Sequence, residues 1–165
     1  MIRSIILTVI LSLAAAILQS TLLAKIAFFF NVVPDLALCV LVFSAYVNGT
    51  MTGQVSGFFS GLFIDFLSQA PLGMNALIRT VTGALAGIFK GALFLDYIVM
   101  PAILCALATI LKAIMMFILH FIIASIPAYS FIEPKFWIEL ALNVISAPLL
   151  FLLLRQFKPM LLGRS

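Results

Sequence analysis

Charged residues are scarce in this chain of 165 residues, and their scarcity excludes a soluble globular fold. Only 8% of the residues are charged and 65% are hydrophobic, whereas soluble domains have about 25% charged residues and fewer than half apolar ones. A soluble domain of this length cannot hide so much apolar surface, so the sequence predicts that lipid is the solvent. The net charge of +4 comes from scattered basic residues, which indicate membrane topology rather than nucleic-acid binding.

Side chains that carry catalysis or bind metals are also few. The chain has one histidine and two cysteines, which excludes a two-histidine metal site and leaves no CxxC spacing. We interpret Cys39 and Cys105 as core residues, and we predict no cofactor. No phosphate-binding glycine loop or serine elbow is present, and Asp65 and Asp96 are predicted in opposite leaflets, too far apart for an aspartate protease. We therefore expect no enzyme activity.

Apolar runs long enough to cross a bilayer fill most of the chain. A spanning helix needs about 20 apolar residues, and the runs are cut at charges, prolines and glycine-rich turns. The sequence therefore predicts an all-α integral membrane protein, a six-transmembrane-helix bundle in a single domain, 1–165. The predicted spans are 4–28, 35–50, 53–69, 75–94, 100–125 and 136–157. The first is interpreted as a retained helix rather than a secretion signal, and fusion of the short second and third spans is the alternative count.

The basic residues predict the orientation. Six spans place both termini on one side of the membrane, and that side carries more basic residues than the other. The positive-inside rule therefore makes both termini cytoplasmic. The basic residues on the cytoplasmic side are Arg3, Lys90, Arg155, Lys158 and Arg164, against Lys25, Arg79 and Lys135 on the outer side.

A carboxylate lies on a helix face of small residues in the third predicted span. Gly53, Gly57 and Gly61 precede Asp65 at intervals of four, so all four residues share one face. Glycines on such a face allow another backbone to approach closely. The carboxylate must be paired, hydrated or turned into the protein, and we expect it to be ionised and hydrogen-bonded.

The fourth predicted span repeats the four-residue spacing, which predicts an antiparallel hairpin centred on Leu72. In that register Asp65 faces Arg79, and the glycines of the two spans meet in pairs. The predicted pairs are Gly61 with Gly83, Gly57 with Gly87, and Gly53 with Gly91. The alternative is that both glycine stripes face other helices.

Other polar residues are interpreted from their positions in the spans. Asp35 follows Pro34 at a helix start, where a carboxylate accepts hydrogen bonds from free backbone N–H groups, so we interpret it as a helix cap rather than a ligand-binding residue. His120 and Glu139 are predicted at equal depth and either pair or face headgroups separately. Lys112 lies in mid-span, and it either reaches a surface by snorkelling or faces a buried acceptor.

Several of these residues follow one another in a recognisable order. Pro34, Asp35 and Leu36 open a helix, and the three glycines of the third span and Asp65 come next. Leu72-Gly73 and Ala76-Leu77 complete the series. The set resembles the PDL…GxxxGFxxGLxxD…LGxxAL pattern of the rod shape-determining MreD family.

The resemblance implies a fold similar to the substrate-binding subunits of vitamin-uptake transporters, with no catalytic residues. It implies a multi-pass inner-membrane component of the bacterial cell-elongation machinery that maintains rod shape. The implied partners are an MreC-type single-span protein, the actin-like MreB, and the elongation-specific glycan polymerase and penicillin-binding transpeptidase. The alternative function is a solute-binding membrane subunit of a vitamin-type transporter.

A partner's helix is expected to bind the first or the last predicted span, because the glycine stripes are used within the hairpin. The last span carries Asn143, Ser146 and Pro148 among bulky residues. We expect these residues to offer polar contacts and a kink.

Overall fold

A computed structural model describes residues 1–23, 32–68, 70–91, 98–123, 131–157 and 159, and within these residues the protein is all helical. The helices are α1 (Ile2–Leu18), continued by the π-helix η1 (Gln19–Leu23), α3 (Leu36–Asn48), α4 (Thr50–Leu67), α5 (Met74–Ile88), α6 (Val99–Ile122) and α7 (Pro134–Arg155). Each predicted span has its own α-helix, so the second and third spans are not fused. Lys25, Asp96, Lys158 and Arg164 lie outside the described residues, as do the span ends 24–28, 69, 92–94 and 124–125.

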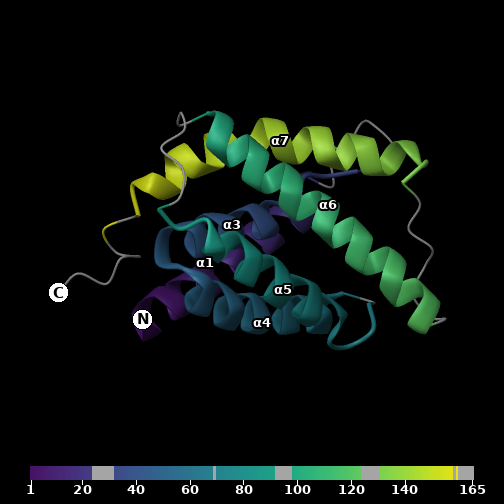
Figure 1. Ribbon diagram of the computed structural model, residues 1–165, viewed down its shortest axis with the longest axis horizontal. Helices are drawn as coiled ribbons and strands as arrows, with labels where there is room; N and C mark the ends of the chain where they lie inside the picture. Colours follow the sequence, from purple (N-terminus) through teal and green to yellow (C-terminus); the bar gives the residue numbers. More distant parts are fainter. Residues whose placement is uncertain (24–31, 69, 92–97, 124–130, 158, 160–165) are drawn as a thin grey trace.

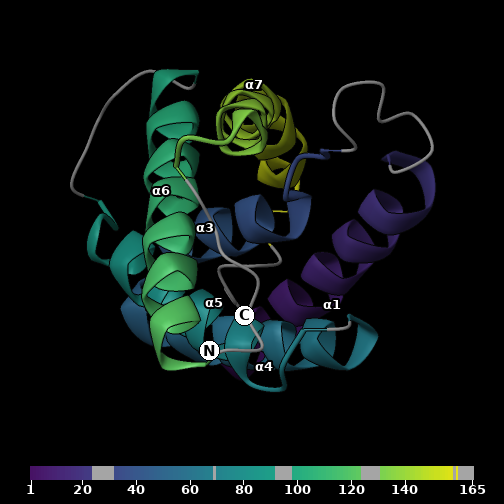
Figure 2. The same ribbon diagram turned by 90° about the vertical axis from the view of Figure 1, so that its right-hand side faces the viewer.

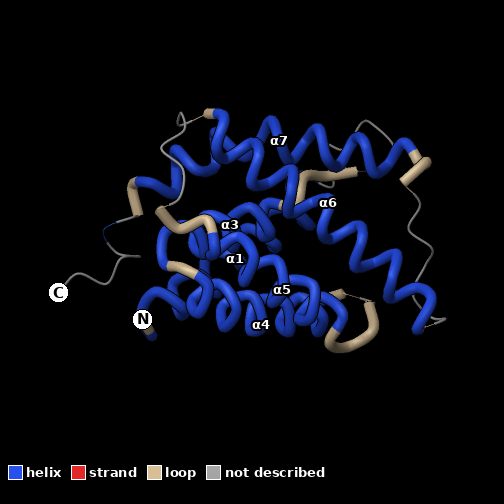
Figure 3. The backbone as a smooth tube through the Cα atoms, viewed as in Figure 1, coloured by secondary structure: helices blue, strands red, loops and turns tan. Residues whose placement is uncertain are grey.

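The helices run back and forth along the long axis of the molecule. In Figure 1 the start of α1 and the end of α7 lie at the left, which we call the terminal end. The turn from α4 to α5 lies at the right, which we call the hairpin end. α1, α3, α4 and α5 are grouped together, while α6 and α7 lie across one side of that group (Figures 1 and 2). The described loops between the helices are short (Figure 3).

Among the described residues, three helices are long and apolar enough to cross a membrane, over Ile2–Thr21, Val99–Ile122 and Pro134–Arg155. α3 is shorter, with 13 residues, which extend about 20 Å at 1.5 Å per residue. A hydrocarbon core is about 30 Å thick. α3 does not have to match that thickness because every residue from Leu36 to Ala45 is buried, so this helix forms the centre of the bundle.

One residue joins α3 to α4. Gly49 has a φ of +100°, a backbone conformation that glycine adopts without steric cost. Lys90 Nζ donates a hydrogen bond to Asn48 O at 2.9 Å, so a side chain from beyond α5 satisfies a carbonyl at the end of α3. The chain therefore reverses direction immediately after the central helix.

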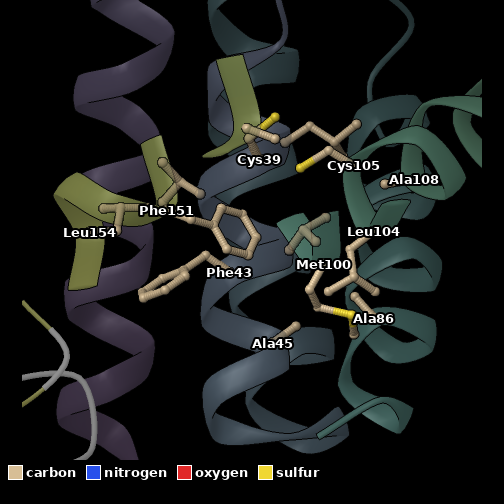
Figure 4. Close-up of a cluster of buried hydrophobic side chains, with 14 residues drawn as sticks. Cys39, Phe43, Ala45, Ala86, Met100, Leu104, Cys105, Ala108, Phe151 and Leu154 are labelled. Atoms are coloured by element: carbon tan, nitrogen blue, oxygen red, sulfur yellow. The ribbon is translucent and has the colours of Figure 1, made fainter. Parts of the chain in front are cut away.

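The apolar core lies between α3 and the helices around it (Figure 4). The rings of Phe43 and Phe151 meet edge to face, with centroids 5.0 Å apart, and this contact joins α3 to α7. Cys39 and Cys105 are buried free thiols in the same cluster as Met100 of α6. Both cysteines therefore occupy the core positions that their apolar surroundings predict.

The face of α1 that packs on α3 carries buried hydroxyl groups beside its apolar side chains. Ser4, Thr8 and Ser12 are buried, the hydroxyls of Thr8 and Ser44 share a hydrogen bond, and Ser12 Oγ donates to Ala37 O at 3.3 Å. The opposite face of α1 exposes large apolar side chains: Ile2, Ile6, Ile10 and Ile17. This distribution reverses that of a helix on a water-soluble protein, and it suits a helix that faces lipid.

α4 and α5 form the predicted antiparallel hairpin, and their backbones touch through glycines. A Cβ atom built on Gly53 would lie 2.2 Å from Gly83 O, and one on Gly57 would lie 2.3 Å from Arg79 O. A Cβ atom on Gly61 would lie 2.5 Å from Ala76 Cα. No real Cβ atom fits at such distances, so the close packing of the two helices requires glycine at all three positions.

The predicted register of this hairpin is wrong by eight residues, or about two helical turns. Gly57 meets Arg79 rather than Gly87, Gly61 meets Ala76 rather than Gly83, and Gly53 meets Gly83 rather than Gly91. Gly87 packs instead on Thr50 and Gly49, and Gly91 lies beyond α5 with a φ of +71° and no atom within 4 Å of a built Cβ. The end of α4 therefore extends past the start of α5.

We predict that Gly57→Ala lowers the free energy of unfolding by about 1–3 kcal/mol, the usual cost of overpacking. The added methyl group would meet the Arg79 carbonyl, so α4 and α5 must separate. Thermal unfolding of the purified protein in detergent micelles measures the effect. Phe66→Leu is the control because it changes an exposed side chain of the same helix. Equal melting temperatures for the two variants would contradict the contact.

Candidate functional site

Asp65 holds the start of α5. Its side chain is only 2% exposed and accepts four hydrogen bonds, all from residues of the turn and the first turn of α5. Oδ2 accepts from Gly73 N at 3.0 Å and from Ala76 N at 3.1 Å, and Oδ1 accepts from Asn75 N and Asn75 Nδ2, both at 2.9 Å. A carboxylate at a helix N-terminus satisfies free N–H groups and suits the helix dipole.

This geometry explains why the register of the hairpin differs from the prediction. Asp65 draws the first residues of α5 back beside the last turn of α4, so the hairpin is not symmetric about Leu72. Gly73 supports the reversal because its φ is +92°. The predicted partner of Asp65 is also wrong, because Arg79 donates to Asp35 instead. The carboxylate is hydrogen-bonded as predicted, but its partners are mainly backbone amides.

Four charged side chains meet inside the bundle and form what we call the charged cluster: Asp35, Arg79, Lys112 and Glu139. Arg79 Nη2 donates to Asp35 Oδ1 at 2.9 Å. Lys112 Nζ donates to Asp35 Oδ2 at 2.9 Å and to Glu139 Oε1 at 2.7 Å. The four residues come from the start of α3 and from α5, α6 and α7, so one ionic network ties four helices together.

Asp35 has two roles in this cluster. Its Oδ1 accepts from Leu38 N at 3.0 Å, which is the capping contact that its position after Pro34 predicts. The ion pairs to Arg79 and Lys112 were not predicted, because the capping role accounted for the carboxylate without them. Asp35 therefore caps the central helix and binds two cations from neighbouring helices.

The charged cluster is balanced and mostly buried. Two carboxylates and two cations give no net charge, and the side chains are between 5% and 19% exposed. Charges in such a place must be paired, because an isolated buried charge is very costly. Lys112 is therefore held by buried acceptors rather than by snorkelling, which decides between the two interpretations of this residue.

Asn143 extends the network into α7 and α6. Its Oδ1 accepts from Asp35 N at 2.7 Å, and its Nδ2 donates to Thr109 Oγ1 at 2.9 Å. The side chain is wholly buried, so the expectation that Asn143 offers a polar contact to a partner is wrong. Ser146 Oγ donates to Asn143 O at 3.3 Å, within its own helix, and Pro148 lies inside α7.

Sequence reasoning left the role of Lys112 open between two interpretations, and it missed Asn75 and Asn143 as members of these networks. Lys112 carried a usable signal, because a cation in mid-span requires an acid and few acids lie within the spans. Glu139 pairs with this lysine, and its pairing with His120 stays a prediction. Among the described residues, no group of three or more histidine, cysteine or acidic side chains is placed to hold a metal ion.

We predict that Asp35→Asn lowers the free energy of unfolding by about 3–5 kcal/mol, because Arg79 and Lys112 then lose their shared counter-charge in a buried site. Glu133→Gln makes the same acid-to-amide change at an exposed residue and is expected to have little effect. Unfolding of both variants in mixed detergent micelles checks this. A small and equal effect of the two changes would show that the cluster does not hold the fold.

Asp65→Asn is expected to loosen the start of α5 without melting the whole helix, because one amide oxygen replaces two charged oxygens. Hydrogen exchange at the amides of Gly73, Asn75 and Ala76 should become about five- to tenfold faster, which corresponds to a helix cap worth about 1 kcal/mol. Exchange at Thr82, later in α5, is the control and should be unchanged. Unaltered exchange at the three capped amides would contradict the role of Asp65.

Comparison with protein families gives a match over nearly the whole chain. The family described as rod shape-determining protein MreD matches residues 1–157, a range that includes every described α-helix and the whole charged cluster. Comparisons with curated proteins and with solved structures find no match, so the likeness to vitamin-transporter subunits stays a prediction. Because the family match extends over nearly the whole sequence, the chain belongs to the rod shape-determining MreD family.

Proposed function

We propose that the protein maintains rod shape as a non-catalytic scaffold of the cell-elongation machinery in the inner membrane. The observation that carries this proposal is the family match over residues 1–157, which makes the chain a rod-shape-determining membrane protein. In the proposed role it binds an MreC-type single-span protein and holds it beside the peptidoglycan-synthesis enzymes and MreB. No observation favours the alternative function in solute transport.

The packing of the bundle supports a role in which a partner binds from outside. The glycine faces of α4 and α5 are in contact with each other, and the charged cluster is buried between helices. These features stabilise the protein itself, so they are not free to bind a partner. A partner's transmembrane helix must therefore use a face that the bundle leaves exposed to lipid.

α7 and α1 carry such faces. Ile145, Leu149 and Leu152 of α7 are exposed at spacings of four and three residues, so they form one apolar stripe. Ile6 and Ile10 form a similar stripe on α1. In lipid, helices associate through close van der Waals packing and interhelical hydrogen bonds. These two stripes are the proposed contact surfaces for the partner's span.

The proposed topology places the terminal end of the bundle in the cytoplasm. Arg3 lies at the terminal end, and Glu133 lies just before α7 at the hairpin end; both are exposed. An impermeant maleimide added outside spheroplasts is therefore expected to label Glu133→Cys and not Arg3→Cys. The native cysteines are buried and give little background. Labelling of Arg3→Cys from outside would reverse the topology.

Photo-crosslinking in native membranes tests the proposed partner. A photoreactive amino acid at Leu149 or Ile10 is expected to give an adduct with the single-span partner from at least one of these positions. Leu85 of α5 is the control, because it is also exposed but lies on neither stripe. An adduct from Leu85 alone would contradict the proposed faces.

Depletion of the protein tests the function itself. Cells that lose it are expected to become round and to mislocalise the single-span partner. Rod-shaped cells after complete depletion would contradict the proposal, whatever the crosslinking shows.

A further inference from the structure

A cavity of about 550 Å³ extends from the surface of the bundle to the charged cluster. Its wall includes residues of α1 and η1 on one side and of α4, α5 and α6 on another. Ser20 and Ser68 line it and are exposed, and Ser68 lies in the turn after α4, at the hairpin end. Asp35, which is buried, and Lys112 also line it. The cavity therefore leads from the hairpin end to the ionic network.

Half of the residues that line this cavity are polar or charged, although such residues are costly between helices in lipid. They include Gln19, Ser20, Ser68 and Asn75 beside three members of the charged cluster. A groove between α1 and α4 provides a contrast, because its lining residues, such as Phe59, are all apolar. Polar cavities with room for water are normally hydrated, whereas apolar ones stay dry. The lining of the cavity therefore indicates water.

Two of the lining side chains have hydrogen-bonding capacity that the protein leaves unused. The side-chain amide of Gln19 makes no hydrogen bond to any described residue. Lys112 has three N–H donors on its ammonium group, and two of them bind Asp35 and Glu139. The Lys112 side chain is also 19% exposed. An acyl chain in the cavity would leave these groups without partners, which is costly, whereas water supplies both donors and acceptors.

We propose that this cavity is an aqueous vestibule through which water from one side of the membrane reaches the charged cluster. Its volume is many times the roughly 30 Å³ that one water molecule occupies in the liquid. Water there lowers the free-energy cost of placing Asp35 and Lys112 between membrane helices, because charges that face a water-filled cavity stay partly solvated. In the proposed topology the hairpin end faces outward, so the water comes from outside the cell.

Cysteine modification of the full chain in liposomes, with reagent on both sides, tests the vestibule. The probe is the water-soluble reagent methanethiosulfonate-ethyltrimethylammonium, and intact mass spectrometry counts its additions. Ala16→Cys places a thiol in the cavity wall, whereas Ala14→Cys places one on the exposed face of α1 that carries Ile6 and Ile10. Ala16→Cys is expected to react at least about tenfold faster, because a thiol ionises in water and its pKa rises in apolar surroundings. Wild type is the blank, since its two cysteines are buried.

A second pair of variants tests whether water reaches the inner end of the cavity. Ala37 lines the cavity near Asp35, and Ala45 lies later in α3, outside the lining; both are buried. The smaller ethylammonium reagent is expected to modify Ala37→Cys and to leave Ala45→Cys unmodified. Melting temperatures are measured alongside. If Ala37→Cys does not fold, Val33→Cys in the same wall replaces it, with Val40→Cys of α3 as its control.

The rates of modification separate the outcomes. Faster modification of Ala16→Cys than of Ala14→Cys, together with modification of Ala37→Cys, supports the vestibule. Equal rates at Ala16→Cys and Ala14→Cys would show that lipid fills the space and overturn it. Modification of Ala16→Cys alone would confine water to the mouth of the cavity and overturn the connection to the charged cluster. These measurements do not involve cell shape, so the vestibule and the proposed function can fail independently.

Discussion

The fold depends on one buried carboxylate, that of Asp35, and on the two cations that bind it. Lipid gives helices no hydrophobic reason to associate, so specific packing and polar contacts must hold a bundle together. Asp35 caps α3 and pairs with Arg79 of α5 and Lys112 of α6. Its backbone N–H also donates a hydrogen bond to Asn143 Oδ1 of α7. α5, α6 and α7 are thus each fixed relative to the central helix by a contact that is costly to break.

The second constraint is the close contact of α4 and α5. Glycine allows the two backbones to touch, but it does not set their register, because several offsets bring small residues together. Asp65 sets it by binding the free amides at the start of α5. The register in turn places Arg79 where it reaches Asp35. The two carboxylates of the PDL and GLxxD segments therefore cooperate: one positions α5, and the other uses that position to bind its arginine.

The presence of each helix was predictable from local features of the sequence: apolar runs, prolines, glycines and a capping aspartate. Its length was less so, because α5 ends at Ile88 whereas the fourth span was predicted to reach residue 94. The hairpin was predictable from its two glycine stripes. The ion-pair partners of the charged side chains were not predictable from the sequence. Lys112 donates a hydrogen bond to Asp35, which lies 77 residues away in the sequence. This contact depends on how α6 crosses the bundle, and the composition of the chain does not determine that crossing. The predicted pairing of Asp65 with Arg79 was wrong because the prediction assumed a symmetric turn. Asp65 instead binds the backbone amides at the start of α5, and these contacts shift α5 along α4.

A double-mutant cycle between Asp35 and Lys112 tests the central role of the ionic network most directly. Asp35→Asn, Lys112→Met and the double variant are unfolded in mixed micelles, and the three losses of stability are compared. If the two side chains stabilise each other across α3 and α6, the double variant should lose at least about 1 kcal/mol less than the sum of the single losses. Additivity within about 0.5 kcal/mol, the limit for independent sites, would contradict the account.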